Sequence, residues 1–181
     1  MVANGLFYSK LIYCMSLWGG IWNLPGVLDD QNRAIPSISK EDTRKLQTLQ
    51  NTVIRLQTGL SKETSREYLL KQSGHLSVHQ LAAYFSILQV HKCKIAKQPH
   101  YLYDRLYPGG NAIKNDLGNL RSETNEHISI NYDKSLTRAS FFYKASKLYN
   151  ALPVTLKETT IISSFKCNVK AWIKLNVTAI P

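Results

Sequence analysis

The chain has 181 residues, of which 44% are hydrophobic and 19% are charged. This composition excludes a disordered chain, since there is enough apolar area to offset the entropy of ordering the backbone, and the length fits one domain or one domain with a small appendage. A net charge of +11 favours a polyanionic partner such as nucleic acid. Charge alone also allows an anionic membrane or a merely solubilising surface.

The first predicted element is a helix at about 6–18, where apolar residues recur at helical spacing. Its buried face is expected to contain Leu6, Phe7, Leu11, Ile12 and Met15. Gly-Gly, Leu-Pro-Gly and Ala-Ile-Pro-Ser follow, and they indicate a loop that continues to Ser39.

The second predicted helix, at about 40–58, has signals at both ends. Ser39 suits the N-cap and Gly59 suits the position after the last turn. Its predicted apolar stripe consists of Leu46, Leu49, Val53 and Leu56. A rotation of about 100° per residue places on the opposite, solvent-facing side Arg44, Thr48, Asn51 and Arg55.

Three helices are predicted in the next region. A short helix at about 65–72 ends at Gly74, and a longer one begins at Ser77, where Gln80 completes a capping box. The longer helix is expected to bury Leu81, Tyr84, Phe85 and Leu88. Pro99 suits the first turn of the third helix, which a Pro-Gly-Gly sequence ends.

Residues 111–135 are polar and interrupted, although the alternation in 127–133 allows one short β-hairpin. Helical periodicity returns after Arg138 and continues to Asn150. Lys144 and Lys147 flank a predicted core stripe that consists of Phe141, Ala145, Leu148 and Tyr149. The alternative for this aromatic segment is an exposed surface on which Phe142 or Tyr143 stacks with bases.

The last predicted helix has Ser163 or Ser164 as its N-cap. It is expected to bury Phe165, Val169, Trp172 and Ile173. The cations on it recur every four residues, which predicts a basic stripe along one side: Lys166, Lys170 and Lys174.

The cysteines indicate a reducing compartment. Cys14, Cys93 and Cys167 are odd in number and show no CxxC spacing, which argues for free thiols and an intracellular location, nuclear or cytoplasmic. No segment reaches the length of a membrane span, and the N-terminal residues lack the pattern of a signal peptide. We therefore expect no membrane association.

Several segments, taken in order, resemble the C-terminal part of the reverse transcriptase of non-LTR (LINE-type, Jockey-like) retrotransposons. Residues 5–20 are similar to the apolar thumb segment of that family, and 46–59 (LQTLQNTVIRLQTG) are similar to its LQ-QN-R-G helix. Residues 66–92 resemble its short Leu-Leu helix and the long helix that follows. Residues 120–125 and 140–173 resemble its end, with the pattern SF-A-KLWN-LP-L-S-FK.

The resemblance implies a mainly α fold. We expect a thumb-like helical domain at 1–98, an irregular connector at 99–135 and a C-terminal basic helical segment, formed by a pair of helices, at 136–181. The palm, fingers and endonuclease of the family precede the part that this chain resembles. The expected role is therefore that of a non-catalytic fragment or descendant of an RNA-directed DNA polymerase.

In that family the thumb grips the template–primer duplex by its backbone. The resemblance therefore implies non-sequence-specific binding of RNA or of an RNA–DNA duplex, and contact with the missing palm and fingers where the chain is part of a larger protein. The candidate nucleic-acid-binding residues are Lys10, Arg44, Lys45, Arg55, Lys144, Lys147, Lys166, Lys170 and Lys174. Lysine and arginine can neutralise phosphates without reading bases, and such binding weakens steeply with salt.

No catalytic residue, cofactor or metal site is predicted. Asp29 and Asp30 superficially match the paired aspartates of a polymerase palm, but they lie in a predicted loop without flanking strands. His75 and His79 are spaced as metal ligands on a helix, yet Ser77 between them is a predicted N-cap. Both pairs are therefore expected to be ordinary surface or cap residues.

Two other hypotheses remain. The chain can be a helical protein-interaction or structural module that derives from such an element and does not bind nucleic acid, because its basic residues are spread over several helices. It can also self-associate, if the apolar face of the 6–18 helix once packed against a palm and is now exposed.

Overall fold

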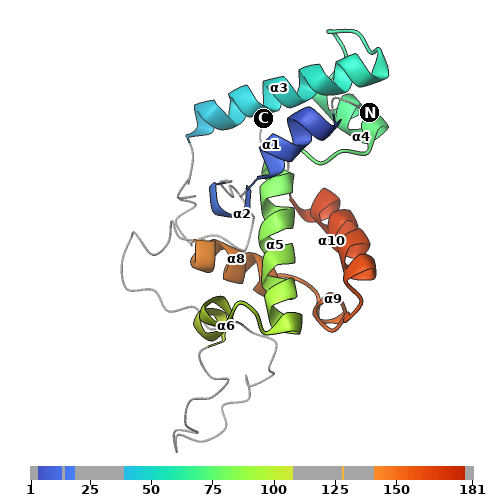
Figure 1. The fold of residues 1–181 in the computed structure, drawn as a ribbon. Helices are drawn as coiled ribbons and strands as arrows, with labels where there is room; N and C mark the ends of the chain where they lie inside the picture. Colours follow the sequence, from blue (N-terminus) through green and yellow to red (C-terminus); the bar gives the residue numbers. More distant parts are fainter. Residues whose placement is uncertain (1–3, 14, 19–38, 108–127, 129–140, 178–181) are drawn as a thin grey trace, which may run out of the picture.

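The computed structural model describes residues 4–13, 15–18, 39–107, 128 and 141–177, which are helical and contain no strand (Figure 1). This confirms the mainly α fold class. The helices are η1 (Asn4–Tyr8), α1 (Ser9–Ile12), α2 (Met15–Trp18), α3 (Lys40–Thr58), α4 (Arg66–Ser73), α5 (Val78–Ala96), α6 (His100–Leu106), α8 (Phe141–Asn150), α9 (Val154–Lys157) and α10 (Ile162–Asn176). Apart from Ile128, the segment predicted as a β-hairpin lies outside the described residues.

Helix α5 is the centre of the molecule. In Figure 1, α3 crosses above one end of it, while α2, α6, α8 and α10 pack around its length. As a result α5 is buried around most of its circumference, and not along the single stripe that was predicted. Leu88 is buried as expected and Leu81, Tyr84 and Phe85 are half-buried, but the most enclosed positions are Ala83, Ile87, Val90 and His91. A helix with neighbours on several sides has no continuous solvent face.

The main hydrophobic core joins α5 to the C-terminal helices. It includes Ile87 of α5 and Leu106 of α6, and it confirms the stripes predicted for the last two long helices, with Ala145, Leu148, Tyr149, Phe165, Val169 and Ile173 buried. Full burial of each large side chain contributes about 1.5–3 kcal/mol. The predicted thumb-like domain at 1–98 and the predicted C-terminal segment at 136–181 thus share one core. The division of the chain at residues 98 and 135 stays a prediction.

The N-terminal segment packs near the start of α5, at the end that α3 crosses. The prediction of one continuous helix at 6–18 was wrong, since α1 ends at Ile12 and Tyr13 has a non-helical ψ of 120°. Leu11 and Met15 are buried against Val78 and Ala82 of α5. The apolar face that we expected to be exposed is therefore covered by this chain itself, and only Leu6 of the predicted set is largely exposed, at 65%.

Helix α3 buries only part of its predicted stripe: Leu46 and Val53 pack against the cluster of Leu11, Met15 and Val78, as expected. Leu49 and Leu56 are 54% and 80% exposed, whereas Ile54 and Gln50 are fully buried. The reason is that Gln50 has polar partners inside: its Nε2 donates to the carbonyl of Leu76 at 2.7 Å. A buried amide is stable when its hydrogen bonds are made, so Gln50 lies on the inner face although the predicted apolar stripe did not include it.

The helix ends largely follow the predicted capping signals. Ser39 accepts the N–H of Asp42 at 3.0 Å, and Gly59 adopts a left-handed φ of 68° after α3. Ser77 and Gln80 form the predicted capping box at the start of α5. The predicted cap of α10 was wrong: this helix begins at Ile162, after Ile161, without a side-chain hydrogen bond to its first turn.

Candidate nucleic-acid interface

Helix α10 forms because apolar residues recur at its inner positions and because it contains no glycine or proline. The inner residues Phe165, Val169 and Ile173 fix the helix rotation. The lysine that follows each of them along the chain therefore points to solvent. Lys166, Lys170 and Lys174 are all exposed, as predicted, and successive lysines lie about 6 Å apart along the axis. We call these three residues the lysine row.

No acid among the described residues neutralises the lysine row. Helix α10 contains no aspartate or glutamate. Within the part of the chain that the structure describes, none of the three lysines forms an ion pair, and the ion pair that does occur is on α3. The ammonium groups therefore keep their charge available for an external anion.

Hydrogen bonds at both ends hold α10 against α5. Near its C-terminus, Nε2 of Gln80 donates to the carbonyl of Val177 at 2.8 Å. Near its N-terminus, the ring of His91 stacks on Phe165 with centroids 3.4 Å apart, and its Nε2 lies 2.8 Å from the carbonyl of Thr159. Because a carbonyl only accepts, Nε2 carries the proton and Nδ1 accepts from the hydroxyl of Tyr149 at 3.1 Å. The lysine row is thus held on a fixed support.

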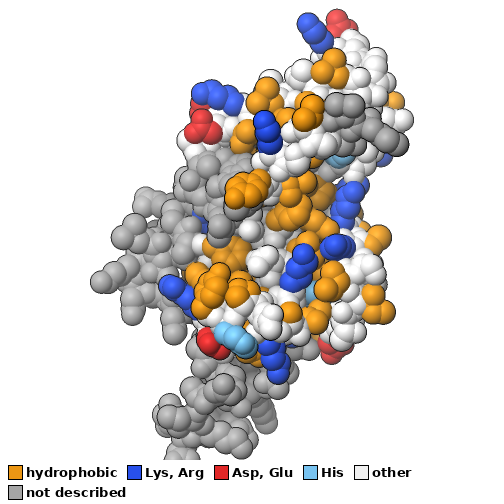
Figure 2. Space-filling model, viewed as in Figure 1, with side chains coloured by type: hydrophobic (Ala, Val, Ile, Leu, Met, Phe, Trp, Pro, Cys, Tyr) orange, Lys and Arg blue, Asp and Glu red, His pale blue; other side chains and the backbone are white. Residues whose placement is uncertain are grey.

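A pocket lies beside the middle of the lysine row. It has a volume of about 320 Å³ and is lined by residues from η1, from α1, from the loop after α4, from α5 and from α10: Tyr8, Ile12, His75, Leu76, Leu81, Tyr84 and Lys170. Figure 2 shows hydrophobic side chains over this part of α5, with Lys and Arg side chains beside them over α10. The lining is mostly apolar and includes three aromatic rings, and the one fully charged group in it is Lys170.

The electrostatics of the pocket follow from this arrangement. Burial, and then the positive charges of Lys170 and Lys174, lower the pKa of His75 below its usual value. The imidazole is therefore neutral at pH 7, and it stacks on the ring of Tyr8 with a centroid distance of 4.8 Å and an angle of 10°. Both of these stacked rings line the pocket, and each covers one face of the other.

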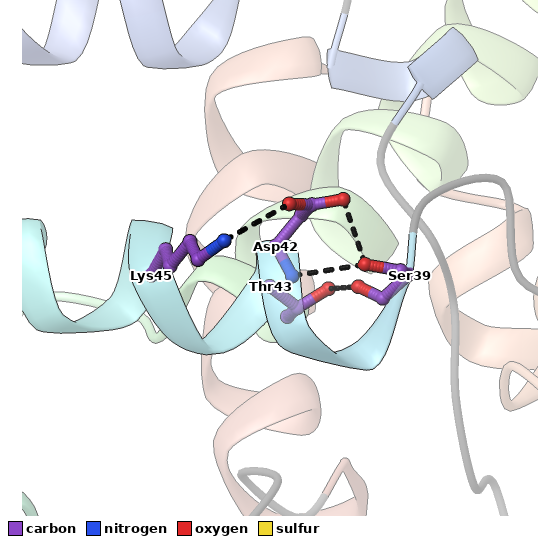
Figure 3. A network of polar contacts seen from close by, with 4 residues as sticks. All are labelled: Ser39, Asp42, Thr43 and Lys45. Carbon is purple, nitrogen blue, oxygen red and sulfur yellow. Dashed lines mark hydrogen bonds and ion pairs between the residues drawn. The ribbon is translucent and has the colours of Figure 1, made fainter.

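The cations predicted on α3 have different surroundings. Arg44 is exposed, but Lys45 lies 3.9 Å from the carboxylate of Asp42, which itself accepts from the hydroxyl of Ser39 (Figure 3). Arg55 donates from Nε to the carbonyl of Ser61 at 3.3 Å and from Nη2 to that of Thr64 at 3.0 Å. Arg55 therefore fixes the loop between α3 and α4, and Arg44 is the most available of the three.

The remaining candidates differ in accessibility. Lys10 is exposed on α1. Lys144 is only 4% exposed, and burial lowers its pKa, so its ammonium cannot meet a phosphate while α8 is packed. Lys147 is half-buried, with Nζ 5.8 Å from the centroid of the Tyr143 ring. Because Tyr143 is also buried and Phe142 is half-buried, the aromatic segment forms core, as the first of its two interpretations predicted.

The pocket was not predicted from the sequence. Its aromatic residues, Tyr8, His75 and Tyr84, come from three separate segments, and no spacing relates them to Lys170. They come together only because the segments that carry Tyr8 and His75 pack against α5, which carries Tyr84. A single sequence contains no signal of such a contact, because each residue fits an ordinary core or loop position.

Other candidate chemistry has no support among the described residues. No group of three or more His, Cys, Asp or Glu side chains is placed there to hold a metal ion. His79 is buried and His75 faces the pocket, while Asp29 and Asp30 lie outside the described ranges. None of the helices that the structure describes is long and apolar enough to cross a membrane.

Comparison of this chain with protein-family models, with curated proteins and with solved structures gives no match.

Proposed function

We propose that the chain binds the sugar–phosphate backbone of nucleic acid without sequence specificity, and that the lysine row of α10 is the main contact. The observation that carries this proposal is the row itself: three exposed, regularly spaced lysines on an acid-free helix that is held rigidly. Arg44 and Lys10 are secondary contacts. Lys144 is excluded by its burial, and Arg55 by its structural hydrogen bonds.

The resemblance to the end of non-LTR reverse transcriptases supports the same function. It suggests that the ligand is RNA or an RNA–DNA duplex and that a separate palm performs the chemistry. In this proposal the chain is a non-catalytic fragment or descendant of such an enzyme and acts inside the cell, in the nucleus or cytoplasm. The free thiols of Cys93 and Cys167 suit a reducing compartment.

The test is the salt dependence of binding to an RNA–DNA duplex, measured by fluorescence anisotropy. Replacing Lys166, Lys170 and Lys174 with Gln should weaken binding at low salt and reduce the slope of log Kobs against log salt by about 2 to 3, since each phosphate contact contributes about 0.7–0.9. A matched control replaces three exposed lysines elsewhere, Lys62, Lys71 and Lys92, and removes the same charge.

The control should change the slope by less than the α10 variant does. Equal effects of the two variants would mean that only net charge matters, and that the lysine row is not the interface. No binding of the unmodified chain at low salt would overturn the proposed function altogether.

A second candidate function, a protein-interaction module, is favoured by one observation. Leu49 and Leu56 lie two turns apart on α3 and are 54% and 80% exposed. Such a pair can contact a partner helix or a second copy of the chain. Sedimentation velocity of the unmodified chain and of the L49Q/L56Q variant distinguishes the possibilities: loss of a concentration-dependent dimer in the variant would support self-association through α3.

A further inference from the structure

The pocket beside Lys170 extends the proposed function from the backbone to the base. We propose that it accepts one unpaired base of the bound nucleic acid, so that the preferred ligand has a bulged or overhanging nucleotide. This inference rests on the proposed function, because the backbone must first be held by the lysine row. The evidence is the size of the pocket, its aromatic lining and the place of Lys170 in both features.

The size of the pocket fits a base. At about 320 Å³ it lies at the lower end of the range of about 300–1,000 Å³ that is typical of ligand pockets. It is roughly twice the volume of about 150 Å³ that encloses a benzene ring in an engineered cavity. One or two fused rings can therefore enter, whereas a folded peptide segment is too large.

The lining provides surfaces for stacking. His75 and Tyr8 form a parallel pair of rings, and Tyr84 extends from α5 into the same pocket. Aromatic rings bind unstacked bases through their faces, at about 1–3 kcal/mol per base. Since His75 is neutral, a base meets a ring face there without the cost of burying a charge.

Lys170 connects the two contacts. It is the middle residue of the lysine row and also lines the pocket. A backbone that runs along Lys166, Lys170 and Lys174 therefore passes the pocket entrance, and the nucleotide nearest Lys170 can turn its base inward. The same lysine can therefore contact a phosphate while the attached base lies in the pocket.

The polar groups of the pocket predict little discrimination among bases. The hydroxyl of Tyr8 already lies 3.4 Å from the side-chain nitrogen of Gln50, which donates to it. The remaining polar groups are the hydroxyl of Tyr84, the imidazole of His75 and the ammonium of Lys170. Stacking on aromatic ring faces is possible for every base, because each base has a π-face.

The experiment compares three RNA–DNA duplexes of equal length in fluorescence anisotropy at low salt. One is fully paired, one has a single bulged nucleotide, and one has an abasic residue at the bulge, which keeps the phosphate but lacks the base. We expect the bulged duplex to bind about tenfold more tightly than the abasic one, within the range that base stacking allows. Equal affinity for the two would overturn the inference.

Two variants locate the effect. H75L/Y84L keeps apolar volume but removes two ring faces, and should reduce the ratio of bulged to abasic affinity to about one while binding of the paired duplex changes little. The control H100L/Y101L removes the same residue types from exposed positions on α6 and should leave the ratio unchanged. A readout that needs no variant is photocrosslinking of a bulged 5-iodouracil, which should attach to Tyr8, His75 or Tyr84.

Crosslinking elsewhere, with none at these three residues, would also overturn the inference. Its failure can be separated from failure of the proposed function. If paired duplex binds with a steep salt dependence but the base adds nothing, the backbone function stands and only the base pocket is lost. If none of the three duplexes binds, both are lost.

Discussion

His91 is enclosed where α5, α8 and α10 meet, and both of its ring nitrogens have partners. The hydroxyl of Tyr149 donates to Nδ1 at 3.1 Å, and Nε2 donates to the carbonyl of Thr159 at 2.8 Å. Burial is the largest influence on the ring and lowers its pKa, an effect to which the charge of Lys94 adds and which the hydrogen bond to Thr159 opposes. The folded state therefore holds the neutral imidazole.

This arrangement predicts how stability depends on pH. The pKa of His91 is lower in the folded chain than its unfolded value of 6.5, so the unfolded chain takes up the proton first as pH falls. The free energy of unfolding should be largest above pH 6.5 and should decrease below it, until His91 is protonated in the folded state as well. Urea unfolding on both sides of pH 6.5 measures this.

The variant H91Q isolates the contribution of this residue. It should be less stable than the parent above pH 6.5, and its stability should vary less with pH. Some dependence of the same sign should remain, because the pKa of His75 is also lowered. An H91Q variant with the full pH dependence of the parent would show that His91 is not the buried titrating group.

At the level of the elements, α10 is positioned chiefly through α5. Gln80 has two roles there: its Oε1 accepts the N–H of Ser77 at 3.1 Å, and its Nε2 donates to the carbonyl of Val177 at 2.8 Å. The first contact completes the capping box of α5, and the second fixes the end of α10 near Lys174. One side chain thus couples the start of the central helix to the lysine row.

We therefore expect Q80A to loosen the last turn of α10. The substitution should reduce stability by about 1–2 kcal/mol, because it removes half of a capping box and one partly buried hydrogen bond. Amide hydrogen exchange near residues 173–177 should become faster. The control S77A removes the hydroxyl half of the capping box and should leave exchange in α10 nearly unchanged; equal acceleration in both variants would contradict the role of the contact with Val177.

Sequence patterns predicted some elements better than others, for physical reasons. Local signals were reliable: the capping box at Ser77 depends only on residues near it, and the lysine row follows from the helical repeat. The inner face of α3 was only partly predicted, because the burial of Gln50 depends on the carbonyl of Leu76, a distant partner. Burial of Lys144 was likewise missed, since it results from the packing around α8.

For the molecule as a whole, the shared core predicts cooperative unfolding. Phe165 of α10 is fully buried in the cluster that includes Ile87, Leu106 and Tyr149. F165A should reduce stability by about 3–5 kcal/mol, as is usual for a large buried side chain. Because α5 belongs to the same cluster, the loss should appear equally in far-UV circular dichroism and in tyrosine fluorescence.

Two separate transitions would contradict this prediction. They would show that the C-terminal segment at 136–181 folds independently, as the sequence-based division allows. In that case the lysine row would be carried by its own domain, and its position relative to the pocket residues of α1 and α5 would not depend on the core.

Lysine footprinting tests whether α10 meets the nucleic-acid backbone through its lysine row. The chain is treated with a limiting amine-acetylating reagent at low salt, with and without an RNA–DNA duplex, and modification is quantified by mass spectrometry. We expect the duplex to protect Lys166, Lys170 and Lys174, while the exposed Lys62, Lys71 and Lys92 stay reactive. Protection spread evenly over both sets, or absent from α10, would contradict this expectation.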